Sequence, residues 1–185
     1  MRARHPAAAA RSGAHRRLGR SRLVADDGFQ AQADWESLRS PETYLGYEQA
    51  QNFASPGFAA DESRTYRVPE PLNRNEWALE GDWTIGAGAS VPNGADGRLA
   101  FRFHARDAHL VMGPRERGTE VPFRVLLDGD PPGPAHGFDV DEDGHGTLSR
   151  QRLHQLIRQH EEIRDRTLEI SFPEAGAEAY CFTFG

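Results

Sequence analysis

The sequence predicts an all-β protein built as one antiparallel β-sandwich. From about Tyr66 onward, short apolar runs alternate with polar residues at a period of two, and clusters of Gly, Pro, Asn and Asp separate the runs. Side chains of a strand alternate between the two faces of its sheet, so this spacing predicts strands with one buried face, packed as two layers. The expected strands are residues 65–68, 76–79, 82–85, 99–104, 109–112, 122–127, 147–158, 167–172 and 179–184.

The alternation assigns side chains to faces. Leu99, Phe101 and Phe103 are expected on the core side of their strand, with Arg102 and His104 on the opposite side. The run 167–172 alternates in the same way, with its apolar residues turned to the core.

The last run places a thiol inside a strand. Tyr180, Phe182 and Phe184 are expected to share one face, and Cys181 lies on the other face or against a second layer. We interpret Cys181 as a small packing residue, because nothing near it in the sequence would lower the pKa of its thiol.

Residues 149–164 fit two structures. Leu153, Leu156 and Ile157 have a spacing that a helix would also use for an apolar stripe. The flanking β runs favour a strand, followed by a turn near His160, and we predict the strand.

Length and composition predict one folded domain with an N-terminal tail. Residues 1–33 are rich in Arg, Ala, Ser and Gly, with few large apolar residues, so we expect disorder there. Residues 34–58 are expected to form a linker lying on the domain surface, and residues 59–185 the sandwich.

Charge argues against a nucleic-acid partner. Residues 1–22 hold seven Arg and no acid. Residues 23–185 hold 15 Arg and 28 Asp and Glu, so their formal net charge is about −13. An acidic body repels phosphate backbones. No apolar stretch approaches the roughly 20 residues that span a bilayer, and no signal peptide is evident, so the sequence assigns no compartment.

Motifs for catalysis are missing. The one cysteine, Cys181, excludes a C-x-x-C pair and a multi-cysteine zinc site within this chain, and neither G-x-S-x-G nor a phosphate loop occurs. His104, His109, His136 and His145 do not have the spacing of a zinc site. We therefore predict that the chain is not an enzyme and needs no cofactor.

Two groups of residues are candidates for ligand binding. The rings of Trp77 and Trp83 stack on sugars if they are exposed, although a tryptophan in a sandwich is more often a core residue. The second group consists of polar residues expected to point outward from strands that could share one face, where their side chains would bind hydroxyls or carboxylates: Arg102, His104, Arg124, Gln155 and Arg158.

A weak cation site is the only metal candidate. Asp139, Asp141 and Asp143 match the first half of a calcium-binding loop, with Gly144 following. The position where a closing glutamate is required is Arg150, so we favour a solvated acidic turn.

Several segments resemble one family in order and spacing. They are Ser40–Tyr47 with Phe53, Trp77–Trp83, Phe101–Asp107, Leu110–Pro114, Val121–Gly129 and Ala179–Gly185. Over about residues 35–185 the sequence resembles the C-terminal region of DipZ-type thioredoxin-like proteins.

The resemblance implies a role beside a redox domain. In that family the segment like residues 40–53 follows a thioredoxin-fold domain, and the region beyond it is a jelly-roll sandwich similar to carbohydrate-binding modules. Members are often extracytoplasmic or membrane-tethered, and are associated with thiol-disulfide exchange and cytochrome c maturation. This sequence lacks the C-x-x-C thioredoxin domain, and Cys181 does not match a catalytic cysteine.

The resemblance therefore predicts a non-catalytic accessory module. One expected partner is a carbohydrate. The alternative is an interaction or structural domain that positions a thioredoxin domain or its redox partner.

Overall fold

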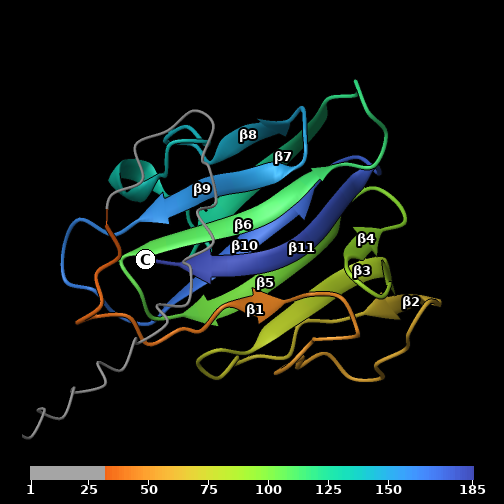
Figure 1. Cartoon of the computed structure of the whole chain (residues 1–185), viewed down its shortest axis with the longest axis horizontal. Helices are drawn as coiled ribbons and strands as arrows, with labels where there is room; N and C mark the ends of the chain where they lie inside the picture. Colours follow the sequence, from red (N-terminus) through yellow and green to blue (C-terminus); the bar gives the residue numbers. More distant parts are fainter. Residues whose placement is uncertain (1–31) are drawn as a thin grey trace, which may run out of the picture.

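The computed structural model describes residues 32–185, which form an all-β antiparallel fold (Figure 1). The disordered tail expected at residues 1–33 falls almost wholly outside the described residues. Within residues 32–185, no helix has the length and apolarity needed to cross a membrane. The elements are β1 (Thr43–Tyr44), β2 (Ser63–Tyr66), β3 (Trp77–Ile85), β4 (Ser90–Pro92), β5 (Gly97–Phe103), β6 (Asp107–Pro114), β7 (Val121–Leu127), the 3-10 turn η1 (Gly133–Ala135), β8 (His145–Leu148), β9 (Arg152–Arg158), β10 (Arg166–Phe172) and β11 (Ala177–Phe184).

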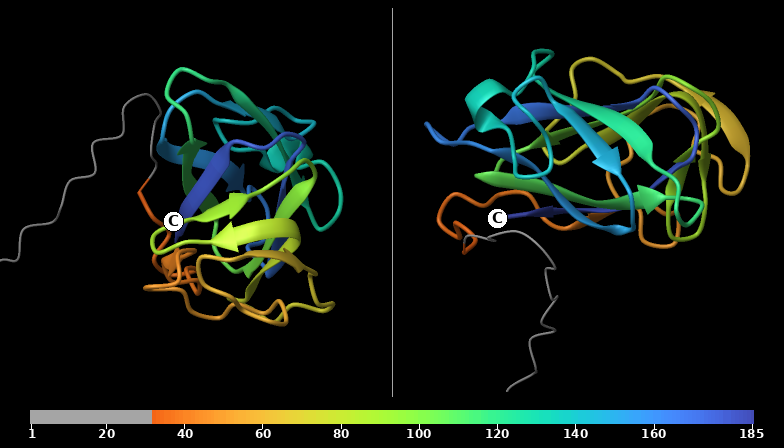
Figure 2. Two further views of the ribbon diagram at one scale, coloured as in Figure 1. Left: turned by 90° about the vertical axis from the view of Figure 1, so that its right-hand side faces the viewer. Right: turned by 90° about the horizontal axis from the view of Figure 1, so that it is seen from above.

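The strands form one curled sheet that folds into two layers (Figures 1 and 2). The back layer has the order β8-β7-β10-β5-β3, and the front layer continues as β3-β4-β11-β6-β9, with β1 paired to β11 and β2 to β3. From β4 to β11, successive strands alternate between the layers except at the β7–β8 hairpin. The expected all-β antiparallel fold is confirmed, and this alternation is consistent with jelly-roll connectivity.

β3 joins the two layers because it bends at Gly81. Residues 77–80 of β3 pair with β5 in the back layer, and residues 81–85 pair with β2 and β4 in the front layer. Gly81 has a φ of 91°, in the left-handed region that residues with a Cβ rarely adopt. The sequence predicted two strands here, but they are one strand, because the glycine bends the chain without reversing it.

Aromatic rings fill the space between the layers. Phe101 of β5 and Phe103 are fully buried, as the alternation predicted. The Phe101 ring contacts two rings of β11 in the opposite layer, with centroid distances of 4.9 Å to Phe182 and 5.2 Å to Phe184. Each fully buried aromatic side chain contributes about 1.5–3 kcal/mol of transfer free energy, so these contacts hold the layers together.

The ambiguous segment 149–164 contains a strand, as predicted. β9 pairs with β6 at the edge of the front layer, and the chain turns after Arg158. The expected run 147–158 is divided, however, because residues 145–148 form β8 in the back layer. Residues 149–151 carry the chain from one layer to the other, a crossing that strand periodicity does not indicate.

A bulge in β11 shifts the alternation. The register of β11 against β6 changes between Ala179 and Cys181, so Tyr180 is the extra residue. Ala179 and Phe182 are both fully buried, whereas Tyr180 is partly exposed. Tyr180 therefore does not share the core face with Phe182 as the strict alternation predicted.

The chain before β2 lies on the front layer. β1 pairs with β11, placing Thr43 opposite Phe182 and Tyr44 opposite Cys181. Leu45, the next residue, is fully buried and belongs to the main core. We call residues 32–47 the strap, because they lie across the sandwich and attach to it at several points.

Candidate functional site

The two tryptophans are core residues. Trp77 and Trp83 both have a relative exposure of 0%, because the bend of β3 turns one ring inward from each layer. Their indole nitrogens donate hydrogen bonds to backbone carbonyls, Trp77 to Gln51 and Trp83 to Glu80, each at 2.8 Å. A buried ring has no free face for a sugar, so of the two interpretations the structure agrees with core residues and not with stacking platforms.

The polar candidates do not share one face. Arg102 of β5, His104 just beyond it and Arg124 of β7 belong to the back layer, in which β10 lies between β5 and β7. Gln155 and Arg158 lie on β9, at the far edge of the front layer. The expected single binding face is therefore divided between two layers.

Arg158 and Gln155 have structural roles. Arg158 Nε lies 2.6 Å from Asp107 Oδ1, and Arg106 Nη2 lies 2.6 Å from the other oxygen of the same carboxylate. The Asp107 side chain is only 2% exposed, so this buried charge requires both partners. Gln155 is only 7% exposed, so its side chain is buried in the fold.

The aspartate turn also has a structural role. Asp139 Oδ1 lies 2.6 Å from Arg152 Nη2, and Asp139 Oδ2 accepts the Gln155 N–H at 2.6 Å. Asp141 accepts the backbone N–H of His145 at 2.8 Å. No group of three His, Cys, Asp or Glu side chains converges as a metal site in residues 32–185. Both oxygens of the Asp139 carboxylate are therefore occupied, one by the Arg152 guanidinium and the other by a backbone N–H of β9.

A cluster of charged groups surrounds Asp165 at one end of β5. His104 Nδ1 lies 2.6 Å from Asp165 Oδ1, while Arg74 Nη1 and Arg102 Nη2 lie 3.6 and 3.8 Å from its carboxylate oxygens. Arg102 therefore makes only a long contact, and its guanidinium keeps donors for another partner.

A groove of about 640 Å³ lies on the outer face of the back layer, next to Arg102. Its volume falls within the range of ligand-binding pockets. The floor comes from β5 and β10, one wall from residues 68–72, and the other from the turn after β7. The lining residues are Val68, Pro69, Glu70, Pro71, Leu72, Arg98, Ala100, Arg102, Asp128, Gly129, Thr167 and Glu169.

Ion pairs fix the polar groups of this groove. Arg98 lies between two carboxylates, with nitrogen–oxygen distances of 2.6 Å to Glu80 and 2.6 Å to Glu169. Leu72 and Ala100 form a small buried cluster with Ala78, which holds the apolar wall against the sheet. The groove thus combines preorganised polar groups with an apolar side, as ligand sites on rigid strands do.

Cys181 is buried beside the strap. β1 pairs with its strand in the same sheet, and Cys181 Sγ lies 3.5 Å from Glu42 Oε1. Burial, together with the negative charge of Glu42, raises the pKa of the Cys181 thiol to about 12. The reactive thiolate is then almost absent at neutral pH, in agreement with the prediction of a packing cysteine.

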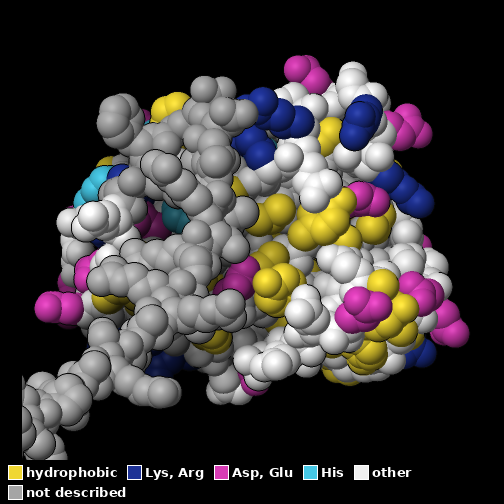
Figure 3. Space-filling model, in the orientation of Figure 1, with side chains coloured by type: hydrophobic (Ala, Val, Ile, Leu, Met, Phe, Trp, Pro, Cys, Tyr) yellow, Lys and Arg dark blue, Asp and Glu magenta, His cyan; other side chains and the backbone are white. Residues whose placement is uncertain are grey.

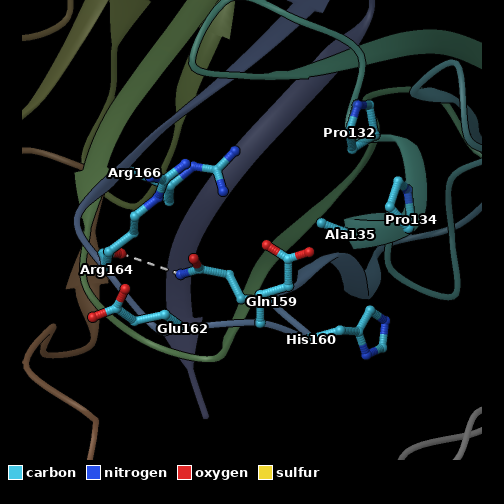
Figure 4. A pocket seen from close by; sticks show the side chains of 9 residues that line it. Pro132, Pro134, Ala135, Gln159, His160, Glu162, Arg164 and Arg166 are labelled. Atoms are coloured by element: carbon cyan, nitrogen blue, oxygen red, sulfur yellow. Dashed lines mark hydrogen bonds between the residues drawn. The ribbon is translucent and has the colours of Figure 1, made fainter.

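A second hollow, of about 400 Å³, lies beside the end of β9 and the start of β10 (Figure 4). η1 forms one side, and the loop from β9 to β10 forms the other. We call it the end pocket. Its lining residues are Pro132, Pro134, Ala135, Gln159, His160, Glu161, Glu162, Arg164 and Arg166.

A third hollow, of about 610 Å³, lies at the opposite end of the front layer. The loops 115–118 and 149–151 contribute arginines to it, and Glu178 adds an acid. Arginine side chains gather toward the upper part of the front face in Figure 3, and acidic side chains are interspersed among them. A mixed surface of this kind is typical of a solvated face.

Two buried histidines have a nitrogen without a hydrogen-bond partner in the described structure, His109 Nδ1 and His154 Nε2. Burial, helped by the nearby Arg152, lowers the pKa of His154 to about 4. Burial also lowers the pKa of His109. His154 packs against Phe123 with a centroid distance of 6.1 Å, so it is a neutral core residue near pH 7.

Comparison with known proteins defines the family of this chain. A family model described as "Thioredoxin like C-terminal domain" matches residues 40–185. The chain belongs to this family. The match begins at the strap and ends at the last residue of the chain, so it includes both β1 and β11.

Two curated relatives carry the name Protein DipZ, one from Mycobacterium bovis and one from Mycobacterium tuberculosis. Each is 27% identical to this chain over 146 residues, which cover 79% of this chain and 18% of the relative. The chain therefore spans about a fifth of the length of these relatives.

The sequence did not predict all the residues that line the groove beside Arg102, nor those that line the end pocket. Arg102 was identified, but the wall at residues 68–72 was not, because it converges on β5 from a distant part of the chain. Gln159 was also missed, since a single glutamine after a strand has no distinctive pattern. The sequence Pro131-Pro132-Gly133 is typical of a turn, but it does not indicate which other residues would line a pocket with it.

Proposed function

We propose that this chain is a non-catalytic accessory domain of a thioredoxin-like redox protein, which holds a neighbouring redox domain in a fixed orientation. Membership of the thioredoxin-like C-terminal domain family supports the redox context. The observation that supports the positioning role is the attachment of the strap. A domain preceding residue 32 would be joined to a segment that is itself fixed to the sandwich.

Hydrogen bonds tie the first part of the strap to the end of β5. Arg106 Nη2 donates to the Gln32 carbonyl at 2.6 Å, and the Arg39 N–H donates to the His104 carbonyl at 2.9 Å. The His104 N–H in turn donates to Ser40 Oγ at 2.8 Å. Residues Gln32, Arg39 and Ser40 of the strap are therefore all hydrogen-bonded to the segment 104–106 of the sandwich.

The second part of the strap is tied to the front layer. The Leu45 N–H donates to the Tyr180 carbonyl at 2.9 Å, and Ser90 Oγ donates to the Leu45 carbonyl at 2.7 Å. The Tyr47 N–H donates to the Gly86 carbonyl at 2.9 Å. Backbone hydrogen bonds and the burial of Leu45 together stabilise the attachment of the strap to the front layer.

The buried thiol supports the non-catalytic part of the proposal. Thiol-disulfide exchange requires an accessible thiolate, and Cys181 is buried with a raised pKa. The proposed role of this domain is therefore to position a neighbouring domain, and not to exchange disulfides through Cys181.

A fusion tests the positioning role. A thioredoxin is joined directly before residue 32, and residual dipolar couplings are measured for both domains. One common alignment tensor is expected for the fusion, and separate tensors would overturn the proposal. Replacing Ser40 with Gly removes a strap contact and should loosen the coupling, whereas Arg124→Gln, on the back layer, should leave it unchanged.

We further propose carbohydrate binding as a second candidate function, located at the groove beside Arg102. The supporting observation is the combination of an apolar wall at residues 68–72 with fixed polar groups, which suits a polyhydroxylated chain. Trp77 and Trp83 are buried, and Trp35 does not line the groove, so the readout is calorimetric titration with oligosaccharides and not tryptophan fluorescence. Binding that Arg102→Ala abolishes and Arg124→Ala preserves supports this function, and the absence of heat with every glycan class overturns it.

A further inference from the structure

The base of the end pocket is a buried glutamine whose amide is held in one orientation. Gln159 is 5% exposed. Its Nε2 donates to the Ala105 carbonyl at 2.8 Å and to the Arg164 carbonyl at 3.2 Å, which uses both of its hydrogens (Figure 4). No described residue donates a hydrogen bond to its Oε1. The pocket therefore contains an oriented oxygen that can accept a hydrogen bond from a ligand.

Hydrogen-bond donors lie on one side of this acceptor. Arg166 is oriented by the contact of its Nε with Asp128 Oδ2 at 2.5 Å, which leaves its terminal nitrogens available. Arg164 forms no side-chain ion pair with any residue in 32–185. Figure 4 shows Gln159 between these arginines and the apolar residues of η1. A ligand here can accept from a guanidinium and donate to the Gln159 oxygen.

The other side of the pocket is apolar and rigid. Pro132 and Pro134 fix the backbone on either side of Gly133, and Ala135 packs against the main core. With about 400 Å³ of space, the pocket is large enough for one side chain and the main chain beside it.

We propose that the end pocket binds an extended peptide segment of a partner protein. One peptide unit offers an N–H to Gln159 Oε1 and a carbonyl to the guanidinium groups of Arg164 and Arg166. An apolar side chain of the peptide packs against Pro132 and Pro134. A peptide carries its donor and acceptor in one planar unit, and this matches a site with an oriented amide acceptor beside guanidinium donors. Glu161 and Glu162 also line the pocket and add further acceptors.

The inference goes beyond the positioning proposal. The strap is hydrogen-bonded to His104 and Arg106, whereas Gln159 is held by Ala105 and Arg164, and no strap residue lines the end pocket. Peptide binding would therefore persist if the strap proved mobile.

Nuclear magnetic resonance of the full chain, labelled with ¹⁵N, tests the proposal. The probe is acetyl-Gly-Phe-Gly-amide, titrated to about 10 mM because a single short peptide is expected to bind weakly. The readout is the side-chain amide resonance of Gln159 together with the backbone resonance of Ala135. Ester analogues, each lacking one N–H, should bind about tenfold more weakly at the position that donates to Gln159.

Two variants and a control locate the site. Gln159→Met removes the acceptor, but it also removes the bonds to two backbone carbonyls. Pro134→Asp changes only an exposed wall residue and should weaken binding about tenfold. Pro56→Asp is the matched control, because Pro56 is exposed and is not part of the end pocket, and it should bind the peptide like the unaltered chain.

The outcomes separate the proposal from its rivals. A saturable shift that the ester analogue and Pro134→Asp both weaken supports peptide binding. The proposal is overturned by no shift at about 10 mM peptide, by equal binding of the amide and all ester analogues, or by tighter binding of cellotriose at the same resonances.

Discussion

Tyr44 of the strap lies directly opposite Cys181 of β11 in an antiparallel pairing. The register places Glu42 Oε1 at 3.5 Å from the sulfur. Because the strap contacts the buried thiol, the reactivity of Cys181 reports whether the strap is in place.

The native thiol is expected to react slowly with a disulfide reagent. With a thiol pKa of about 12, only about one molecule in 10⁴ carries the thiolate at pH 8, and burial restricts access further. Reaction with dithio-bis-nitrobenzoate should therefore follow the opening of the strap and become fast in urea. Leu45→Ala, which weakens the strap, should accelerate labelling of the native chain, whereas Leu72→Ala, outside the strap, should not. A fast stoichiometric reaction of the unaltered native chain contradicts the burial of the thiol.

Removing the charge of Asp139 should destabilise the fold. Asp139→Asn loses the ion pair with Arg152 and weakens the charge-assisted bond to the Gln155 N–H, in a site where the aspartate side chain is only 6% exposed. The free energy of unfolding should fall by about 2–4 kcal/mol in urea titrations. Asp141→Asn is the control, since the Asp141 side chain is 58% exposed, and its effect should be within about 1 kcal/mol. Equal effects of the two variants would refute the structural role of Asp139.

Acid should destabilise the protein through His154. Its pKa is lowered from 6.5 in the unfolded chain to about 4 in the folded one, so the neutral form is favoured by folding. This contribution is complete above about pH 6.5 and is lost as the pH falls toward about 4, reaching about 3 kcal/mol. Urea titrations at several pH values should show a smaller acid sensitivity in His154→Leu than in the unaltered chain. The same slope in both proteins would contradict the account, and His160→Gln, at an exposed site, serves as the control.

The bend of β3 depends on Gly81. Gly81→Ala forces a residue with a Cβ into a φ of 91°, and should lower the free energy of unfolding by about 1–3 kcal/mol. Gly88→Ala is the matched control, because a Cβ there meets no atom within 4 Å and the φ of Gly88 is not left-handed. Thermal unfolding monitored by circular dichroism measures both, and equal stability of the two variants would show that the bend needs no glycine.

Local alternation predicts this fold only where strands are regular. The faces of β5 and β10 follow from Leu99, Phe101 and the matching residues of β10, because a half-buried strand leaves a period of two in the sequence. The bend at Gly81 and the bulge at Tyr180 depend on pairing with distant strands, which the sequence does not display. The same limit applies to the sites: Arg102 was predicted to face outward, but its groove needs residues 68–72 beside it.

Hydrogen exchange of the strap amides tests the central claim most directly. The Leu45 N–H is bonded to the Tyr180 carbonyl and the Tyr47 N–H to the Gly86 carbonyl. If residues 40–47 are part of the folded domain, both amides should exchange as slowly as those of β5 and β11, through opening of the whole domain. Exchange of these two amides at the rate of a free peptide, while β5 and β11 stay protected, would contradict the account.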